Sequence, residues 1–484
     1  VGVASATNGP GVPQLATGLI TATRALSPVV VFVGESNTNH PEHIQRMDQP
    51  ALVKACEAEY IRIESPETVD WAVQKAFYIA RTQSKAVVLA CPRDIQKKKF
   101  SDDDEVYKPS LSLLPKPPIP TAEALSEAAD LITNSKKPVI IVGRGAIWSK
   151  AGEAAKRLAA QTGALIATTM QSQTYLAEDA FHVGISGQFG TRKGIQLFNQ
   201  ADIVIGIGAS LNPYTTSHGY IYPNAKFIQI DIQSHAVMGE GRAADIYVHA
   251  DARIATERLV QELDKRQYQN AGYRTPDVAT QLIGNSDDPE KFEIEPGLLD
   301  PREVCLVLDE LLPLDCVVHS GSGTSATFPT MHLNRPRLFM GGKFWACMGQ
   351  SLPSAIGAAA ALNKPVALIE GDGSIMMHLA ELETAARHNL PLLSVVLNDQ
   401  ALGSEYFKLI ESGLPPTVAR CSTPDLGEVM RAFGGRGTLA TSIEHVRKAV
   451  KEWIANPVTT VIDARISHNV TTIQHRRNRL GQDV

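Results

Sequence analysis

Short apolar runs alternate with glycine turns and helix-like segments along nearly the whole chain. Residues 1–6 and 29–33 are apolar runs of strand length, and residues 12–26 between them have helical spacing. Strands that alternate with helices are typical of parallel sheets with helices on both faces. The pattern therefore predicts an α/β fold built from doubly wound parallel sheets.

Two polar stretches interrupt this pattern. Residues 97–120 are rich in lysine and proline, and residues 264–300 are polar with few apolar positions. Such composition is typical of linkers between domains. It predicts three domains, which we place at residues 1–105, 120–265 and 300–484.

The clearest strand–helix–strand unit lies in the last domain. Asp372 closely follows the apolar run 366–370, and Asp399 closely follows the apolar run 392–397. The helix-like segment 375–388 joins the two runs, so the strands should be parallel. Both aspartates are then expected at the same carboxyl edge of one sheet, where open α/β sheets bind ligands.

The two acidic turns have the composition of a metal–phosphate site. Asp372 lies in Gly371-Asp372-Gly373-Ser374, whose glycines allow close backbone approach and whose amide groups open the next helix. Mg²⁺ prefers carboxylate oxygens and shares its coordination sphere with phosphate oxygens. A capping aspartate in an ordinary turn would look the same. The second acidic turn, one helix and one strand later, favours the metal site.

Gly371-Asp372-Gly373-Ser374 followed by Asn398-Asp399 resembles the diphosphate motif of thiamine diphosphate-dependent enzymes, in the acetolactate synthase and pyruvate decarboxylase branch. The resemblance implies thiamine diphosphate held through Mg²⁺. It implies that Asp372, Asp399 and the carbonyl of Ala401 bind the metal, and that Gly371, Gly373 and Ser374 contact the cofactor. The family usually carries two asparagines at the second turn, so Asp399 adds one negative charge.

The resemblance also names further cofactor contacts. The loop from His319 to Ser325 resembles the first diphosphate-contacting loop, with Gly323 and Thr324 as the contacts. Met348 resembles the bulky apolar residue that bends the cofactor, and backbone groups of Ala346 and Met348 would hold its aminopyrimidine ring. Ordinary core packing is the alternative for the methionine, and an ordinary turn is the alternative for the loop.

Three candidate catalytic residues follow in the same way. Thr7-Asn8-Gly9-Pro10-Gly11 resembles a turn of the family's pyrimidine domain, and Gln49 resembles a glutamine of a later segment of that domain. His40 and His43 lie in a loop after a strand, and either could relay a proton; an exposed loop histidine without a role is the alternative. Glu405 falls where pyruvate decarboxylases carry a catalytic glutamate, and burial could raise its pKa for proton donation. A solvated helix carboxylate is the equal alternative for Glu405.

The three domains then correspond to the family's pyrimidine-binding, central Rossmann-like and diphosphate-binding domains. The central domain binds FAD in some members. Gly187-Gln188-Phe189-Gly190-Thr191 resembles a turn of acetolactate synthases, but Gly208-Ala209-Ser210-Leu211-Asn212 lacks the arginine and aspartate of another. We therefore do not expect FAD.

The first domain looks incomplete at its N-terminus. The family's ylid-activating glutamate precedes the glycine–proline–glycine turn, and here Gly9 lies too near residue 1 to leave room for it. A sheet that began with the first run would also expose an apolar edge. We therefore expect a segment before Val1 in the native protein.

The composition limits the kinds of partner and the cellular compartment that we expect. The 484 residues include 46 Lys and Arg against 51 Asp and Glu, which gives no indication of a nucleic-acid partner. No apolar run approaches the roughly 20 residues of a membrane span, and six scattered cysteines without a zinc spacing suit a reducing cytoplasm. The resemblance implies a homodimer or homotetramer with active sites between subunits.

The reaction implied by the resemblance is cleavage or formation of a C–C bond in a 2-oxo acid or an acyloin. Carboligase, decarboxylase and lyase chemistry stay open, including a lyase of 2-hydroxy ketones or 2-hydroxyacyl thioesters. Lys408 stands where acetolactate synthases carry a tryptophan that shapes the acceptor pocket. A non-catalytic cofactor-binding or assembly subunit of the same fold is the alternative from another class.

Overall fold

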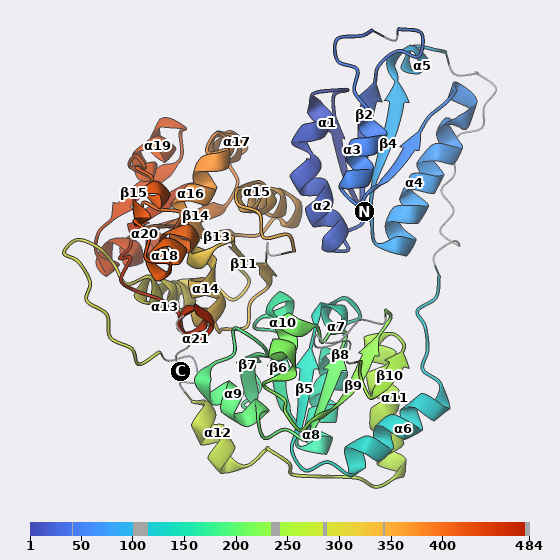
Figure 1. Cartoon of the computed structure of the whole chain (residues 1–484), viewed down its shortest axis with the longest axis vertical. Helices are drawn as coiled ribbons and strands as arrows, with labels where there is room; N and C mark the ends of the chain where they lie inside the picture. Colours follow the sequence, from blue (N-terminus) through green and yellow to red (C-terminus); the bar gives the residue numbers. More distant parts are fainter. Residues whose placement is uncertain (41, 100–114, 234–242, 284–287, 342–343, 480–484) are drawn as a thin grey trace. The chain divides into compact units, whose positions relative to one another are not determined.

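The computed structural model describes residues 1–40, 42–99, 115–233, 243–283, 288–341 and 344–479. These residues form three sheets, and all paired strands within them are parallel. Helices lie on both faces of each sheet (Figure 1). The predicted class, three doubly wound parallel-sheet domains, is confirmed.

The first sheet has the strand order β1-β2-β4-β3. Its strands are Gly2–Ala6 (β1), Val29–Glu35 (β2), Glu59–Arg62 (β3) and Ala86–Pro92 (β4). Its helices are Gly11–Gln14 (α1), Ala16–Arg24 (α2), Gln49–Ala55 (α3), Val69–Gln83 (α4) and Arg93–Gln96 (α5). The single helix expected over 12–26 is thus two helices that meet at Leu15.

Strand β1 is an edge strand of this sheet, and it presents apolar side chains to solvent. It pairs only with β2 among the described strands, and Val3 is 68% exposed. Val31 and Val33 of β2 instead pack with Leu19 of α2 in a buried cluster. The apolar edge expected from the sequence is therefore present.

The central sheet has the order β10-β9-β8-β5-β6-β7. Its strands are Pro138–Val142 (β5), Leu165–Thr168 (β6), His182–Ile185 (β7), Ile203–Ile207 (β8), Lys226–Asp231 (β9) and Ile246–His249 (β10). Its helices are Ala122–Thr133 (α6), Arg144–Trp148 (α7), Gly152–Thr162 (α8), Arg192–Phe198 (α9), Pro213–Thr216 (α10), Ala252–Lys265 (α11) and Pro276–Leu282 (α12).

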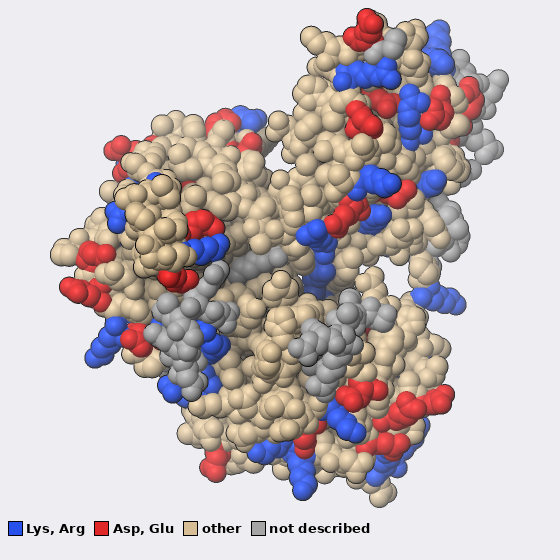
Figure 2. All heavy atoms as spheres, viewed as in Figure 1, with Lys and Arg blue, Asp and Glu red and all other residues tan. Residues whose placement is uncertain are grey.

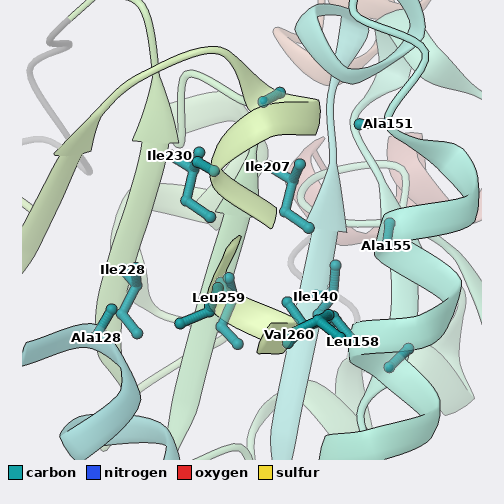
Figure 3. Close-up of a cluster of buried hydrophobic side chains, with 14 of the residues drawn as sticks. Ala128, Ile140, Ala151, Ala155, Leu158, Ile207, Ile228, Ile230, Leu259 and Val260 are labelled. Carbon is teal, nitrogen blue, oxygen red and sulfur yellow. The ribbon is translucent and has the colours of Figure 1, made fainter. Parts of the chain in front are cut away.

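The core of this domain lies between the sheet and its helices. Ile140 and Ile228, from β5 and β9, pack in one buried cluster with Leu158 of α8 and Leu259 of α11 (Figure 3). The two helices bury one apolar face each, and the side chain of Asp251, directly before α11, caps the first turn of that helix. The domain is therefore held by ordinary sheet–helix packing.

The last sheet has the order β12-β11-β13-β14-β16-β15. Its strands are Val317–Ser320 (β11), Phe339–Gly341 (β12), Val366–Gly371 (β13), Leu392–Asn398 (β14), Arg436–Ala440 (β15) and Thr460–Arg465 (β16). Its helices are Pro301–Leu311 (α13), Thr327–His332 (α14), Ser351–Leu362 (α15), Asp372–Ile375 (α16), Glu381–Arg387 (α17), Gly403–Glu411 (α18), Leu426–Ala432 (α19), Ile443–Ala455 (α20) and Ile473–Arg479 (α21).

Two details of the last domain differ from the sequence prediction. The helix expected over 375–388 is divided into α16 and α17 by the 3-10 turn Met376–His378 (η5), and it already begins at Asp372. The loop expected from His319 begins later, because His319 and Ser320 are buried residues of β11. Hydrogen-bonded pairing with β12 and β13 continues to Ser320 and keeps these residues in the sheet.

Contacts divide the chain into two compact units. One holds residues 1–116 and 343–350, and the other holds residues 117–342 and 351–484. Residues 100–114 of the first expected linker and 284–287 of the second lie outside the described residues. The stretch 264–300 is not only a linker, because it contains α12. The predicted domain boundaries stay predictions.

Candidate active site

Asp372 and Asp399 leave two neighbouring strands at the same edge of the last sheet. The register pairs Gly371 of β13 with Leu397 of β14, and both strands run in the same direction. Strand β11 pairs with the other side of β13 and ends at Ser320. The turns after β11, β13 and β14 therefore meet at one carboxyl edge, as the strand–helix–strand pattern predicts.

Two glycines let these turns approach each other closely. A Cβ atom on Gly371 would lie 2.7 Å from Oγ of Ser325, in the turn after β11. A Cβ atom on Gly403 would lie 2.7 Å from Oδ2 of Asp399. Both distances are shorter than real Cβ contacts, so a side chain at either position would displace the hydroxyl of Ser325 or the carboxylate of Asp399. Glycine at these positions thus leaves both polar groups in place at the sheet edge.

The two aspartates form a buried pair of like charges. Asp372 is 1% exposed, and neither of its carboxyl oxygens accepts a hydrogen bond of normal geometry from the described residues. Burial raises the pKa of Asp372. Burial, followed by the charge of Asp372, raises the pKa of Asp399. A divalent cation would supply the missing partner and remove the repulsion, so the donor set fits a metal ion.

The turn after β14 aims Asp399 and Asn398 in different directions. Asn398 donates a hydrogen bond from Nδ2 to Oδ1 of Asp463 on β16 at 2.8 Å, which fixes its amide inside the sheet. Asp399 accepts a hydrogen bond on Oδ1 from the amide of Ala401 at 3.2 Å, across Gln400 with a positive φ of 53°. Asp399 and Ala401 thus lie in one tight turn, the arrangement that shared metal binding requires.

Further polar atoms at this edge are buried without a partner. Oγ of Ser320 and of Ser322 and Oε1 of Glu370 accept or donate no hydrogen bond among the described residues. Gly323 follows with a left-handed φ of 82° and leads into the 3-10 turn Thr324–Ala326 (η4). Buried polar groups normally have partners. The edge of the sheet therefore has unused hydrogen-bonding capacity where the diphosphate loop was predicted.

Glu370 carries a buried carboxyl group at this edge that was not predicted from the sequence. It is the penultimate residue of β13, and burial raises its pKa to about 7. Its Oε2 accepts a hydrogen bond from Oγ of Ser374 at 2.7 Å. The signal was present in the sequence, since an acidic residue ends an otherwise apolar strand directly before the glycine turn.

His468 is a second residue at this edge of the sheet that was not predicted from the sequence. It follows β16, the neighbour of β14, and its Nδ1 lies 3.8 Å from Oδ2 of Asp399. Its ring stacks on Tyr406 of α18 at 4.6 Å between centroids, and the guanidinium of Arg420 lies 5.6 Å from the same tyrosine ring. Extending the carboxyl-edge rule to the last predicted strand would have found it.

Gln49 is fully engaged in the framework of the first domain. Its Oε1 accepts the amide hydrogen of Gly9 at 3.0 Å, and its Nε2 donates to the carbonyl oxygen of Gly34 at 3.1 Å. Gly9 has a left-handed φ of 62°, and a Cβ there would lie 2.1 Å from the carbonyl oxygen of Gln45. Gln49 therefore ties the glycine turn after β1 to the end of β2.

The other predicted residues are placed as follows. His40 is exposed, with its ring edge-on to that of His43 at 5.8 Å. Met348 is half-buried and Ala346 is exposed in the segment 343–350, which groups with the first domain. The structure brings together the predicted residues of the last domain. Those of the other unit stay predictions as parts of the same site.

Glu405 lies in the first turn of α18, a few residues beyond Asp399. Its side chain is 51% exposed and forms an ion pair with Lys408 at 2.8 Å. The catalytic role of Glu405 stays a prediction.

Comparison with known proteins agrees with this site. Residues 125–259 match the central domain of thiamine pyrophosphate enzymes, and residues 320–464 match their C-terminal TPP binding domain. The two matches together span more than half of the chain and include β13 and β14. The chain belongs to the thiamine pyrophosphate enzyme family, and the second match supports thiamine diphosphate as the cofactor.

Several relatives resemble the chain over most of its length. It is 28% identical to an acetolactate synthase large subunit of Parasynechococcus marenigrum, over 96% of this chain and 77% of the relative. It is 26% identical to a sulfoacetaldehyde acetyltransferase of Castellaniella defragrans, over 98% and 82%. It is 27% identical to a probable acetolactate synthase large subunit of Methanocaldococcus jannaschii, over 96% and 80%. The chain is therefore similar to acetolactate synthase large subunits and to a sulfoacetaldehyde acetyltransferase.

The helices and the surface charges bear on membrane association and on charged partners. None of the helices in the described ranges combines the length and the apolar character needed to cross a membrane. On the face shown in Figure 2, basic and acidic side chains are interspersed over the described surface. Neither property distinguishes between the possible reactions.

Proposed function

We propose that the protein is a thiamine diphosphate- and Mg²⁺-dependent enzyme that cleaves or forms a C–C bond in a 2-oxo acid or an acyloin. One observation carries the metal part of the proposal: both carboxyl oxygens of Asp372 are buried and accept no hydrogen bond of normal geometry from the described residues, beside the like charge of Asp399. Two buried carboxylates side by side are costly, and a divalent cation bound between them would compensate their charge.

The residues of the last domain would hold the cofactor. Bound thiamine diphosphate supplies the carbanion and the electron sink for this chemistry. Asp372, Asp399 and the carbonyl of Ala401 would bind Mg²⁺. The turns of the carboxyl edge would bind the diphosphate through Gly323, Thr324, Gly371, Gly373 and Ser374. Met348 and the backbone of Ala346 would set the conformation of the cofactor.

Proton transfer is assigned to residues outside the metal site. Glu405 would deliver a proton to the reacting carbon, and His40 would relay a proton from the first domain. Gln49, the other catalytic candidate of that domain, could contribute only through hydrogen bonds of its amide. FAD is not part of the proposal. The acetyltransferase name of one relative supports a transferase reaction for this chain. A cytoplasmic homodimer or homotetramer with active sites between subunits completes the proposal.

A non-catalytic cofactor-binding or assembly subunit is the second candidate. The exposure of Glu405 and its ion pair with Lys408 favour it, because the side chain lies away from an apolar environment. The buried pair Asp372 and Asp399 supports metal and diphosphate binding, which a catalytic and a non-catalytic member would share. Turnover decides between the two candidates.

The metal site is tested with two variants. Asp372→Ala is expected to abolish binding of thiamine diphosphate in the presence of Mg²⁺, whereas Asp399→Asn should keep it, because an amide oxygen still binds Mg²⁺. Near-UV circular dichroism during cofactor titration measures both. Each change also removes repulsion from the buried pair, so the cofactor-free variants should melt no lower than the wild type. Unchanged binding in Asp372→Ala would refute the site.

The reaction is tested on the wild-type protein. Purified protein with Mg²⁺ and thiamine diphosphate is incubated with a panel of 2-oxo acids and acyloins, and CO₂, aldehyde and acyloin are measured. Turnover of any substrate that is lost when thiamine diphosphate is left out would support the proposal that the protein is an enzyme. Tight cofactor binding with no turnover on the whole panel would favour the non-catalytic subunit.

A further inference from the structure

A short segment of the last domain's sequence packs with the first domain. Strand β12 ends at Gly341 and helix α15 begins at Ser351, both in the second unit, but the residues 343–350 between them group with residues 1–116. The contact is specific. Oγ1 of Thr21, in α2, donates a hydrogen bond of 2.6 Å to Oε1 of Gln350 and lies 3.9 Å from Sγ of Cys347.

The hydrogen bond made by the Thr21 side chain is unusual for a threonine inside a helix. A threonine inside a helix commonly turns its hydroxyl back to a carbonyl of the preceding turn. The hydroxyl of Thr21 instead reaches a residue 329 positions away in the sequence. The hydroxyl of Thr23, two residues on, is buried and has no hydrogen-bond partner among the described residues. The bond to Gln350 is thus particular to Thr21.

The segment that Thr21 contacts has a demanding backbone. Ala346 has a φ of 53° and Gly349 a φ of 84°, so the left-handed region is used on both sides of Cys347 and Met348. This conformation is unfavourable for a residue with a Cβ, such as Ala346, which keeps it only where surrounding contacts impose it. Thr21 supplies two such contacts, to residues on either side of Met348.

We propose that Thr21 is a positioning residue for the cofactor. Through Gln350 and Cys347 it fixes the left-handed turn that presents Met348 and the backbone of Ala346, while it touches neither cofactor nor substrate itself. The inference rests on the proposed function, because Met348 and Ala346 have their roles only if thiamine diphosphate binds. It goes beyond that function by assigning part of the binding affinity to helix α2 of the first domain.

The test compares three variants of the full chain. Thr21→Val keeps the shape of the side chain and removes the hydroxyl. Thr23→Val is the matched control on the same helix, and Thr21→Ser should restore the bond. Thr21→Val is expected to weaken thiamine diphosphate binding about three- to tenfold, the usual effect of one lost hydrogen bond. The turnover number at saturating cofactor should stay unchanged, and Thr23→Val and Thr21→Ser should bind like the wild type.

A second measurement needs no cofactor. Hydrogen exchange of the peptide that covers residues 344–350 should be faster in Thr21→Val than in wild type and unchanged in Thr23→Val. If Thr21→Val does not fold, Gln350→Met removes the same bond from the other side. Wild-type binding and wild-type exchange in both variants would overturn the inference. Failure of the wild type to bind thiamine diphosphate would overturn the proposed function instead, and the positioning role with it.

Discussion

Glu370 and Glu405 show at the residue scale how burial separates two carboxyl groups of one domain. Glu370 is buried, has one oxygen without a hydrogen-bond partner among the described residues, and has a pKa raised to about 7 by burial. Glu405 is half exposed and pairs with Lys408. The family resemblance indicates Glu405 as the proton donor, whereas burial gives Glu370 the raised pKa that such a donor needs.

Glu405→Gln tests the role that the resemblance gives to Glu405. If this residue delivers the proton, aldehyde release should fall about 10²–10⁴-fold, the usual loss of a general acid, while cofactor binding stays unchanged. Lys408→Met is the control, because it removes the same ion pair and leaves the carboxylate in place. Wild-type turnover by Glu405→Gln on every accepted substrate would show that Glu405 is a solvated helix carboxylate without a catalytic role.

At the scale of elements, the C-terminal helix α21 is fastened to three other parts of its unit. Arg476, with a side chain 4% exposed, pairs with Asp288 at 2.7 Å. His475 pairs with Glu411 at the end of α18 at 3.1 Å. Arg477 donates to the carbonyl oxygen of Gly190 in the central domain at 3.1 Å. Helix α18, which begins beside the metal turn, is therefore held at its far end by α21.

Arg476→Met should destabilise this unit by about 3 kcal/mol, because it leaves the carboxylate of Asp288 buried with one partner fewer. The midpoint of thermal unfolding measures the effect. Arg387→Met is the control, since Arg387 forms an exposed pair with Glu383 and should change stability by less than about 1 kcal/mol.

The double variant Asp288→Asn/Arg476→Met should be less destabilised than the sum of its single variants, because the unpaired charge is gone. Strict additivity would show that the two residues do not interact in solution.

The acid stability of the molecule depends on two histidines, His319, which is buried, and His182, which is half-buried with its Nε2 atom shielded from solvent. Burial lowers the pKa of His182, in the central domain, and of His319, in the last domain, to about 4 in each case. An unfolded chain has a histidine pKa near 6.5. Between these values the unfolded state binds more protons than the folded state, so the stabilising contribution is complete above about pH 6.5 and is lost as pH falls towards 4.

Acidification from pH 7 to 5 should therefore lower the unfolding temperature more in the wild type than in the double variant His182→Asn/His319→Asn. Each histidine contributes up to about 3 kcal/mol at neutral pH, from the size of its pKa shift. Glu370 acts in the opposite direction in the same range, since burial raises its pKa. The test is thus the difference in pH slope between wild type and variant, and equal slopes would contradict the prediction.

The sequence by itself determined the architecture and the centre of the candidate site. Strand–helix–strand units have a fixed handedness, so two acidic turns after consecutive apolar runs had to meet at one sheet edge. Asp372 and Asp399 do so, through the pairing of β13 with β14. The glycine before Asp372 could also be predicted to be important, because only a residue without a Cβ leaves room for the hydroxyl of Ser325 there.

Only the tertiary structure decided the environment of each side chain. The exposure of Glu405, the burial of Glu370 and the place of His468 beside Asp399 depend on which elements cover them. The hydrogen bond from Thr21 to Gln350 joins residues 329 positions apart. Periodicity and motif spacing describe neighbours along the chain. Contacts between distant segments follow from the packing of whole elements, and local sequence patterns do not specify them.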